Sequence, residues 1–172
     1  IVTSMLQHSR GGSGKMEPTH LNALIKEYVN LAFHGMRAGK KPINVEIALV
    51  LDDSIGKVKL IGEDFSRVIL NLTNNAFDAM RETAATRPPK LTVRTKQEED
   101  AILIEVEDNG PGIPDDIKDK ILQPFFTTKK GTEGTGLGLS ITNDIIKAHG
   151  GKLDISTKKE EGSVFVITLP TV

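Results

Sequence analysis

The sequence contains no cysteine and no tryptophan, and aromatic residues make up only 4% of its 172 residues. The absence of cysteine excludes a disulfide framework, a zinc–thiolate site and a thiol nucleophile, and it is compatible with a reducing compartment. No apolar run approaches the roughly 18 residues that span a bilayer, and no signal peptide is visible. A net charge of −1 gives no support for nucleic acid or an anionic membrane as a partner.

The length and a hydrophobic content of 38% predict one domain with a single core. The chain begins with Ile1, so we expect a fragment of a longer protein, with a helix tail and linker at residues 1–15 and one domain at 16–172. The glycines from Gly11 to Gly14 end that helix tail. We expect the fragment to be monomeric and cytoplasmic, and a membrane anchor elsewhere in the parent stays open.

Hydrophobic periodicity predicts a mixture of helices and strands without an internal repeat. Helices are predicted at 20–38, 63–85 and 136–148, and strands at 43–51, 58–61, 91–96, 101–108, 152–157 and 164–169. Thr19 is the expected N-cap of the first helix, and Pro88 closes the region after the second. This order fits neither a βαβ array nor an all-β sandwich. It predicts an α+β fold with helices on one face of a mostly antiparallel sheet.

Three polar residues follow the apolar stripe of the second predicted helix. Asn71, Asn75 and Asp78 are spaced i, i+4 and i+7, which places them in one line on the helix surface. Asn and Asp disfavour helix interiors because their side chains compete for backbone hydrogen bonds. The line fits a solvated helix edge or a pocket wall that faces a ligand, and the helix alone leaves both open. An amide oxygen suits Mg²⁺ when phosphates supply the charge.

Asp108 ends a predicted strand and opens the run Asp-Asn-Gly-Pro-Gly. Strand parity puts it on the apolar face with Ile104, so its carboxylate should turn toward the covered side of the sheet. A buried carboxylate needs a hydrogen-bond donor, and the exocyclic amine of adenine would supply one. An ordinary Asp-Asn-Gly turn explains the same residues, and Gly110 and Gly112 suit either interpretation.

A glycine ladder of Gly134, Gly136 and Gly138 stands at the start of the third predicted helix. Glycines at a helix start leave free N–H groups and room for phosphate oxygens, and the helix dipole favours an anion there. Glycine inside a helix costs about 1 kcal/mol, so a ladder at the boundary indicates a function. The sequence contains neither a Walker A motif nor a dinucleotide fingerprint after a strand.

Taken together, these motifs resemble the catalytic and ATP-binding domain of sensor histidine kinases, in the GHKL family that also holds DNA gyrase, the Hsp90 chaperones and the MutL ATPases. Asn71–Ala79 is similar to the N box, Asp108–Gly112 to the G1 box, Pro124–Lys129 to the F box and Gly134–Leu139 to the G2 box. The resemblance covers residues 16–172. It implies the Bergerat fold, a two-layer α/β sandwich with a mixed sheet of about five strands against three helices.

The resemblance also implies how ATP and Mg²⁺ would be held. Asn75 would ligate Mg²⁺ and Asn71 would line the phosphate side, which makes these two the implied catalytic residues. Asp108 would accept a hydrogen bond from the adenine amine and share a water with Thr168. The other implied nucleotide contacts are Asp78, Gly110, Gly112, Ile113, the lid residues Phe125, Phe126 and Lys129, and the run Gly134, Thr135, Gly136, Leu137, Gly138 and Leu139.

Two departures from the family pattern bear on the reaction. The position of Asp78 often carries a basic residue in sensor kinases, so a direct phosphate contact is the weakest of the implied roles. In the gyrase and chaperone branch the place of Asn71 holds a glutamate that activates water, and its absence favours phosphotransfer over hydrolysis. A hydrolytic ATPase and a degenerate nucleotide-binding scaffold are the alternative interpretations.

The phosphoacceptor histidine of a sensor kinase is missing from this sequence. It is expected on a helix, before an acidic residue and then a proline, and His8, His20, His34 and His149 all lack this context. The resemblance implies that dimerisation helices of a homodimeric parent supply the acceptor, with residues 1–15 as their tail. It also implies a downstream response-regulator receiver domain. We expect the histidines present to be structural.

Overall fold

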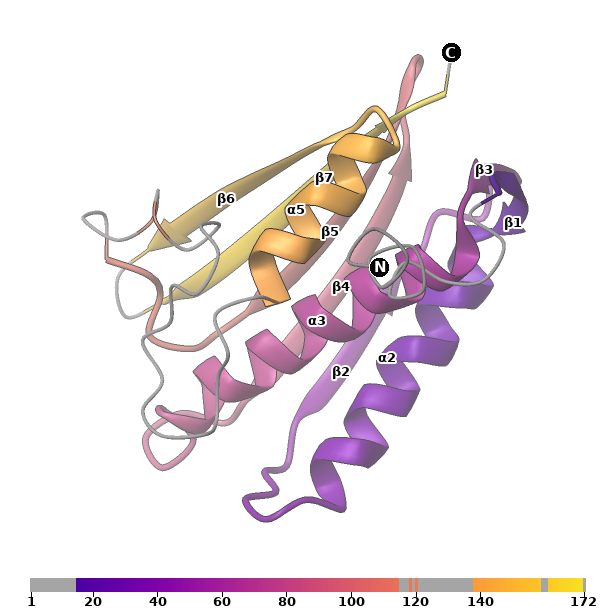
Figure 1. Cartoon of the computed structure of the whole chain (residues 1–172). Coiled ribbons are helices and arrows are strands. Elements are labelled where there is room, and N and C mark those ends of the chain that lie inside the picture. The colour runs from indigo at the N-terminus through magenta and orange to yellow at the C-terminus, as the bar shows by residue number, and fades with distance from the viewer. Residues whose placement is uncertain (1–14, 115–117, 119, 121–137, 159–160, 172) are drawn as a thin grey trace, which may run out of the picture.

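The computed structural model describes residues 15–114, 118, 120, 138–158 and 161–171. Within these residues the chain forms a five-stranded sheet with helices packed on one face (Figure 1). The helices are α2 (Leu21–Arg37), α3 (Gly62–Arg81) and α5 (Gly138–Ala148). The expected α+β, two-layer arrangement is therefore confirmed.

The large sheet has the strand order β2-β4-β5-β7-β6. Its strands are β2 (Glu46–Val50), β4 (Lys90–Gln97), β5 (Ala101–Asp108), β7 (Gly162–Pro170) and β6 (Lys152–Lys158). β2 runs parallel to β4, through a crossover that contains α3, and the other neighbouring pairs are antiparallel. β5 and β7 lie inside the sheet, so the end of β5 is flanked by strands on both sides.

A second, two-stranded sheet pairs β1 (Glu17–His20) with β3 (Lys57–Leu60) in antiparallel register. This pairing corrects the predicted N-cap, because Thr19 lies within β1. Its hydroxyl donates to the carbonyl of Glu17 (2.8 Å), and α2 begins after His20 without a side-chain cap bond. A β-branched residue adopts the extended conformation readily, so strand pairing outweighed the capping preference.

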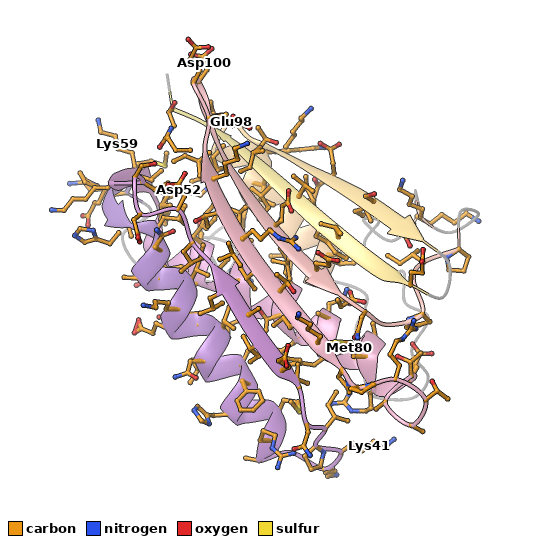
Figure 2. The ribbon with its side chains drawn as sticks, turned by 180° about the vertical axis from the view of Figure 1, so that it is seen from behind. Lys41, Asp52, Lys59, Met80, Glu98 and Asp100 are labelled. Atoms are coloured by element: carbon orange, nitrogen blue, oxygen red, sulfur yellow. The ribbon has the colours of Figure 1, made fainter. Side chains whose placement is uncertain are left out.

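The two faces of the large sheet differ in chemistry. Along β5, buried and half-buried residues alternate from Ile102 to Val106, and the buried ones face the helices as strand parity predicted. The opposite face, seen from behind in Figure 2, carries charged side chains. There Arg94 lies 3.1 Å from Glu105 and 2.7 Å from Glu107. Exposed pairs of this kind contribute about 0–1 kcal/mol each, so the apolar layer between sheet and helices dominates the stability.

A polar network ties α2 to the sheet. The carboxylate of Asp52 accepts from the backbone N–H groups of Gln97 (2.8 Å) and Ser54 (2.9 Å). The bond from Gln97 is the main reason that the pKa of Asp52 lies below its usual value. Asn22 of α2 donates to the carbonyl of Asp52 (2.9 Å) and accepts from the hydroxyl of Thr95 on β4 (2.9 Å). This network fixes the first turn of α2 against the sheet.

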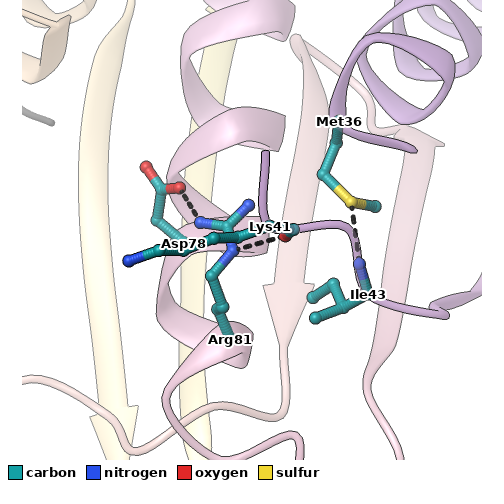
Figure 3. Close-up of polar contacts among 5 residues, drawn as sticks. All are labelled: Met36, Lys41, Ile43, Asp78 and Arg81. Atoms are coloured by element: carbon teal, nitrogen blue, oxygen red, sulfur yellow. Dashed lines mark hydrogen bonds and ion pairs between the residues drawn. The ribbon is translucent and has the colours of Figure 1, made fainter. Parts of the chain in front are cut away.

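The connection from α2 to β2 is held against the C-terminal end of α3 (Figure 3). Arg81 donates through Nε to the carbonyl of Lys41 (2.9 Å) and through Nη1 to Oδ1 of Asp78 (2.5 Å). The N–H of Ile43 donates to Sδ of Met36 (3.3 Å). α3 ends at Arg81, earlier than the periodicity predicted, and turns follow it.

His149 joins the end of α5 to the beginning of α3. Its Nε2 accepts from the backbone N–H of Ile61 (3.0 Å), and Nδ1 lies 2.8 Å from the carbonyl of Ile145. Because Nε2 is an acceptor, Nδ1 carries the proton and donates to that carbonyl. The ring also meets Phe65 edge-on, with 5.2 Å between ring centroids. The expected structural role of His149 is confirmed, and His34 lies exposed on α2.

Gly162, the first residue of β7, provides a test of the close contact between this strand and the end of β5. It has a φ of +122°, and an added Cβ would collide with the carbonyl oxygen of Asp108. We expect Gly162→Ala to lower the free energy of unfolding by about 2 kcal/mol or more. The control Gly35→Ala, in α2 with nothing within 4 Å of an added Cβ, should raise it by about 0.5–1 kcal/mol because alanine favours a helix. Urea unfolding measures both, and equal midpoints would contradict the prediction.

Candidate functional site

Asn71 joins α3 to the start of α5. Its Nδ2 donates to the carbonyl of Gly138 (3.2 Å) and to the hydroxyl of Thr142 (3.3 Å), which is fully buried. Gly138 is the first residue of α5 in the described chain, so these bonds fix that end of α5 beside α3. The amide nitrogen of Asn71 is therefore used inside the protein, and its oxygen is the atom suited to a cation or a water.

Asn75 and Asp78 follow Asn71 along α3, and both are half-buried. Asn75 lies one helical turn after Asn71, as its spacing predicted. The carboxylate of Asp78 accepts from Arg81, whose Nε holds the α2–β2 connection (Figure 3). A nucleotide contact by Asp78 stays a prediction, and this carboxylate has a structural partner that competes with it.

Asp108 ends β5 with its side chain turned into the protein, and only 3% of the residue is exposed. The N–H of Gly110 donates to Oδ1 (2.9 Å), and the N–H of Ser163 on β7 also bonds to the carboxylate. Burial raises the pKa of Asp108 to about 6. The two N–H bonds and the charge of Arg87 act in the opposite direction, whereas Glu107 adds to the increase. The predicted orientation toward the covered side is confirmed.

The two glycines after Asp108 are required by the geometry of the loop. An added Cβ on Gly110 would lie 3.0 Å from the carbonyl carbon of Ala79 in α3 and 3.0 Å from Oδ1 of Asp108. Gly112 has a φ of +82°, in the left-handed region that favours glycine. Ile113 follows and packs against the core. The loop thus passes close to the backbone of α3, directly beside the buried carboxylate.

The structure corrects the predicted role of Thr168. In the register of β5 with β7, Asp108 lies opposite Ser163, whereas Thr168 lies opposite Leu103. Thr168 is an odd number of positions from Ser163, so its side chain points to the other face of the sheet. A water shared by Thr168 and Asp108 is therefore excluded. Ser163, which is 4% exposed, is the hydroxyl residue beside Asp108, and it lies one position before the predicted strand 164–169, so the sequence did not reveal it.

Sequence reasoning also missed Thr142, Arg87 and Thr157. Nη2 of Arg87 donates to the carbonyl of Gly110 (3.0 Å), and the hydroxyl of Thr157 accepts from the N–H of Ile113 (2.8 Å). Thr142 had a sequence signal, since it lies within the predicted third helix, one turn after Gly138 of the glycine ladder. The other two stand in a turn and at a strand end that no motif marks.

Part of the predicted contact set lies outside the residues that the structure describes. These are the lid residues Phe125, Phe126 and Lys129 and the phosphate-binding residues Gly134, Thr135, Gly136 and Leu137. Gly138 and Leu139 are described. The carbonyl of Gly138 accepts from Asn71, and Leu139 is half-buried and packs against the core. Their contacts with a nucleotide stay predictions.

A family profile described as "Histidine kinase-, DNA gyrase B-, and HSP90-like ATPase" matches residues 61–172. The chain belongs to this family. The matched region begins just before α3 and contains Asn71, Asn75 and Asp108, so the family predicted from the four boxes is confirmed.

Within the described residues, no helix combines the length and the apolar character needed to cross a membrane.

Curated relatives of the chain are sensor kinases. The chain is 40% identical to the sensor kinase CckA of Brucella abortus over 137 residues, which cover 74% of this chain and 14% of CckA. It is 35% identical to the sensor protein FixL of Bradyrhizobium diazoefficiens over 170 residues, which cover 99% of this chain and 32% of FixL. The chain therefore spans less than half of either relative.

Solved structures show the same fold. The catalytic domain of histidine kinase ThkA matches 91% of this chain and 96% of its own length, with a TM-score of 0.77 and 32% identity. Kinase ThkA in complex with the response regulator protein TrrA matches 99% of this chain and 46% of that one, with a TM-score of 0.73 and 28% identity. The predicted fold class is confirmed by this likeness.

The raised pKa of Asp108 predicts a pH-dependent affinity for ADP. In its predicted role, ionised Asp108 would accept a charge-assisted bond from the adenine amine, and protonation near the pKa of about 6 would weaken that bond. Asp108→Asn should weaken binding by about 2–3 kcal/mol at high pH, because its amide oxygen stays on the N–H of Gly110 and its NH₂ faces another donor. Calorimetry should show the wild-type affinity falling toward that of the variant as the pH is lowered from about 8 to about 5.

The phosphates of ADP also change protonation with pH, but they do so equally in experiments with the wild type and with Asp108→Asn. The difference in affinity between the two proteins therefore reports on Asp108 alone. A difference in affinity that does not change with pH would contradict the prediction.

The stability of the unliganded domain should depend on pH in the opposite direction to the affinity. Because the folded state binds this proton more tightly than the unfolded chain, Asp108 adds stability below its unfolded pKa of 3.8, and that stability is lost as the pH rises through about 6.

Proposed function

We propose that this domain binds ATP with Mg²⁺ and transfers the γ-phosphate to a histidine on the dimerisation helices of its parent kinase. The observation that carries the proposal is the buried carboxylate of Asp108, which stands beside a loop that passes against α3. The similarity to sensor kinases over most of the chain supports the same activity.

The adenine end of the proposed site is formed by Asp108 and its loop. The carboxylate already accepts from Gly110 and Ser163, and an ionised carboxylate has lone pairs for further donors. The exocyclic amine of adenine is only a donor, so it matches this group. Guanine presents an acceptor at the same place, which would face the carboxylate without a proton between them. The site should therefore select adenine over guanine.

The phosphate end fits the junction of α3 and α5. The start of α5 lies beside Asn71, and a helix N-terminus favours an anion. The amide oxygen of Asn75 is a ligand of the kind that Mg²⁺ takes together with phosphate oxygens and waters. Bound Mg²⁺ would neutralise part of the phosphate charge. In the part of the chain that the structure describes, no cluster of three or more His, Asp or Glu could hold a metal alone, so the cation would depend on the nucleotide.

Asn71 supports phosphotransfer rather than hydrolysis. Its amide nitrogen is engaged by Gly138 and Thr142, and the side chain has no carboxylate to take a proton from water. Without a base for water at this place, the rate depends on the positioning of the acceptor and on charge neutralisation. The acceptor imidazole would come from another segment, because His20, His34 and His149 lack the sequence context of a phosphoacceptor.

The proposed partners follow from this requirement. The acceptor histidine would lie on dimerisation helices of a homodimeric parent, and a response-regulator receiver domain would then take the phosphate. The likeness to kinase ThkA bound to a response regulator protein supports the second partner. Any attachment to a membrane would be made by parts of the parent outside this domain.

Asn75→Ala should remove the dependence of nucleotide binding on Mg²⁺. We expect the affinity for ADP without metal to change little, because the adenine end of the site is intact, while the gain on adding Mg²⁺ disappears. Calorimetry with ADP, with and without Mg²⁺, measures both values. Asn74→Ala, an exposed neighbour on α3, is the matched control and should keep the gain. A full Mg²⁺ effect in Asn75→Ala would reject the ligand assignment.

The domain alone should bind Mg-ATP without labelling itself or turning it over appreciably. Phosphotransfer should appear when the parent's dimerisation helices are added, because they bring the acceptor imidazole to the γ-phosphate. The experiment uses radiolabelled ATP with the domain alone and with the helices. Acid-labile label on the isolated domain would show that its own histidines are acceptors. Tight binding with no label on the helices would favour a scaffold, and rapid phosphate release would favour a hydrolytic ATPase.

A further inference from the structure

The loop that follows Asp108 is held from outside the four boxes. At the start of the loop, Asn109 donates through Nδ2 to the carbonyl of Pro88 (2.8 Å) and accepts through Oδ1 from the N–H of Lys90 (2.9 Å). Arg87, in the same connection between α3 and β4, donates through Nη2 to the carbonyl of Gly110 (3.0 Å). These bonds fix the entry of the loop and the orientation of the peptide after Gly110.

The far end of the loop is held by Thr157 at the end of β6. The hydroxyl of Thr157 accepts from the N–H of Ile113 (2.8 Å) and from the hydroxyl of Ser163 (3.4 Å). Its own proton can reach the carbonyl of Gly162 (3.3 Å) or that of Ile113 (3.4 Å). Ser163 is the residue paired with Asp108. One hydroxyl therefore connects the exit of the loop to the strand that also supports the buried carboxylate.

We propose that Arg87 and Thr157 are positioning residues for the loop at residues 109–113, here called the base-binding loop, and that they hold it in its binding conformation before the nucleotide arrives. This inference rests on the proposed nucleotide binding and adds the residues that preorganise it. Neither side chain needs to touch the nucleotide. Arg87 acts on the carbonyl of Gly110, and Thr157 acts on the N–H of Ile113.

Preorganisation matters here because of the composition of the loop. Gly110 and Gly112 have a wide conformational choice, and ordering them on binding would reduce the affinity. Gly110 also has no spare room, since a Cβ there would already crowd Ala79 and Asp108. A small displacement of the loop would therefore alter the space beside the carboxylate. Bonds at both ends remove that freedom in advance.

The first test uses the unliganded wild type and needs no substitution. If the loop is preorganised, the amide hydrogen of Ile113 should exchange slowly without nucleotide, because Thr157 accepts it. Thr157→Val keeps the shape of the side chain and removes the hydroxyl, so this amide should become fast, while Thr157→Ser should restore protection. Fast exchange of the Ile113 amide in the unliganded wild type would overturn the inference.

The second test measures ADP affinity by calorimetry at about pH 8, where Asp108 is ionised. Thr157→Val and Arg87→Met should each weaken binding about three- to tenfold, the range expected for one lost hydrogen bond. Thr157→Ser should bind as the wild type does. The controls are Thr92→Val, on the open face of β4, and Arg37→Met, at the end of α2, and both should leave the affinity unchanged.

A double-variant cycle separates positioning from general destabilisation. If Thr157 acts through the base-binding loop, Thr157→Val should have little further effect in an Asp108→Asn background, because the bond that it supports is already lost. Equal losses in both backgrounds would overturn the inference, as would wild-type affinity in Thr157→Val and Arg87→Met. Absence of ADP binding to the wild type would instead reject the proposed function.

Discussion

Burying the carboxylate of Asp108 costs free energy that the N–H groups of Gly110 and Ser163 offset only in part, because the pKa of the group is raised to about 6. In a binding protein, a ligand that donates a further hydrogen bond to this carboxylate would offset the remaining cost. The rest of the site is arranged around this group: β7 supports it from one side, and the loop turns past it on the other. Stability is thus given up at the place where the proposed function needs affinity for a hydrogen-bond donor.

α3 connects the two ends of the proposed site. Its backbone at Ala79 forms one wall for Gly110, and its side chain at Asn71 anchors the start of α5. The start of α3 is in turn joined to the end of α5 through His149. Both ends of α5 are tied to α3, and the loop beside Asp108 passes against the same helix at Ala79, so α3 relates the base end of the proposed site to its phosphate end. A rigid frame of this kind lowers the ordering cost of binding a charged ligand.

Much of the fold was predictable from local pattern. Alternation along β5 placed Asp108 on the covered face, and the spacing of Asn71 and Asn75 placed them one turn apart on one helix. These predictions succeeded because strand and helix periods are properties of the backbone alone. The predictions that failed depended on strand pairing. Thr19 joined β1 rather than capping α2, and Thr168 fell on the wrong face and far from Asp108 in register.

The sequence by itself determined the family, the layers and the candidate residues of the site, because motif spacing and the periods of strands and helices are read along the chain without any partner segment. Only the tertiary structure decided which residues support them. Arg87 reaches Gly110 from a turn, and Thr157 reaches Ile113 from another strand, 44 positions along the chain. Contacts of this kind depend on the register between distant segments. Local propensity carries no information about that register, so it appears only when the sheet is assembled.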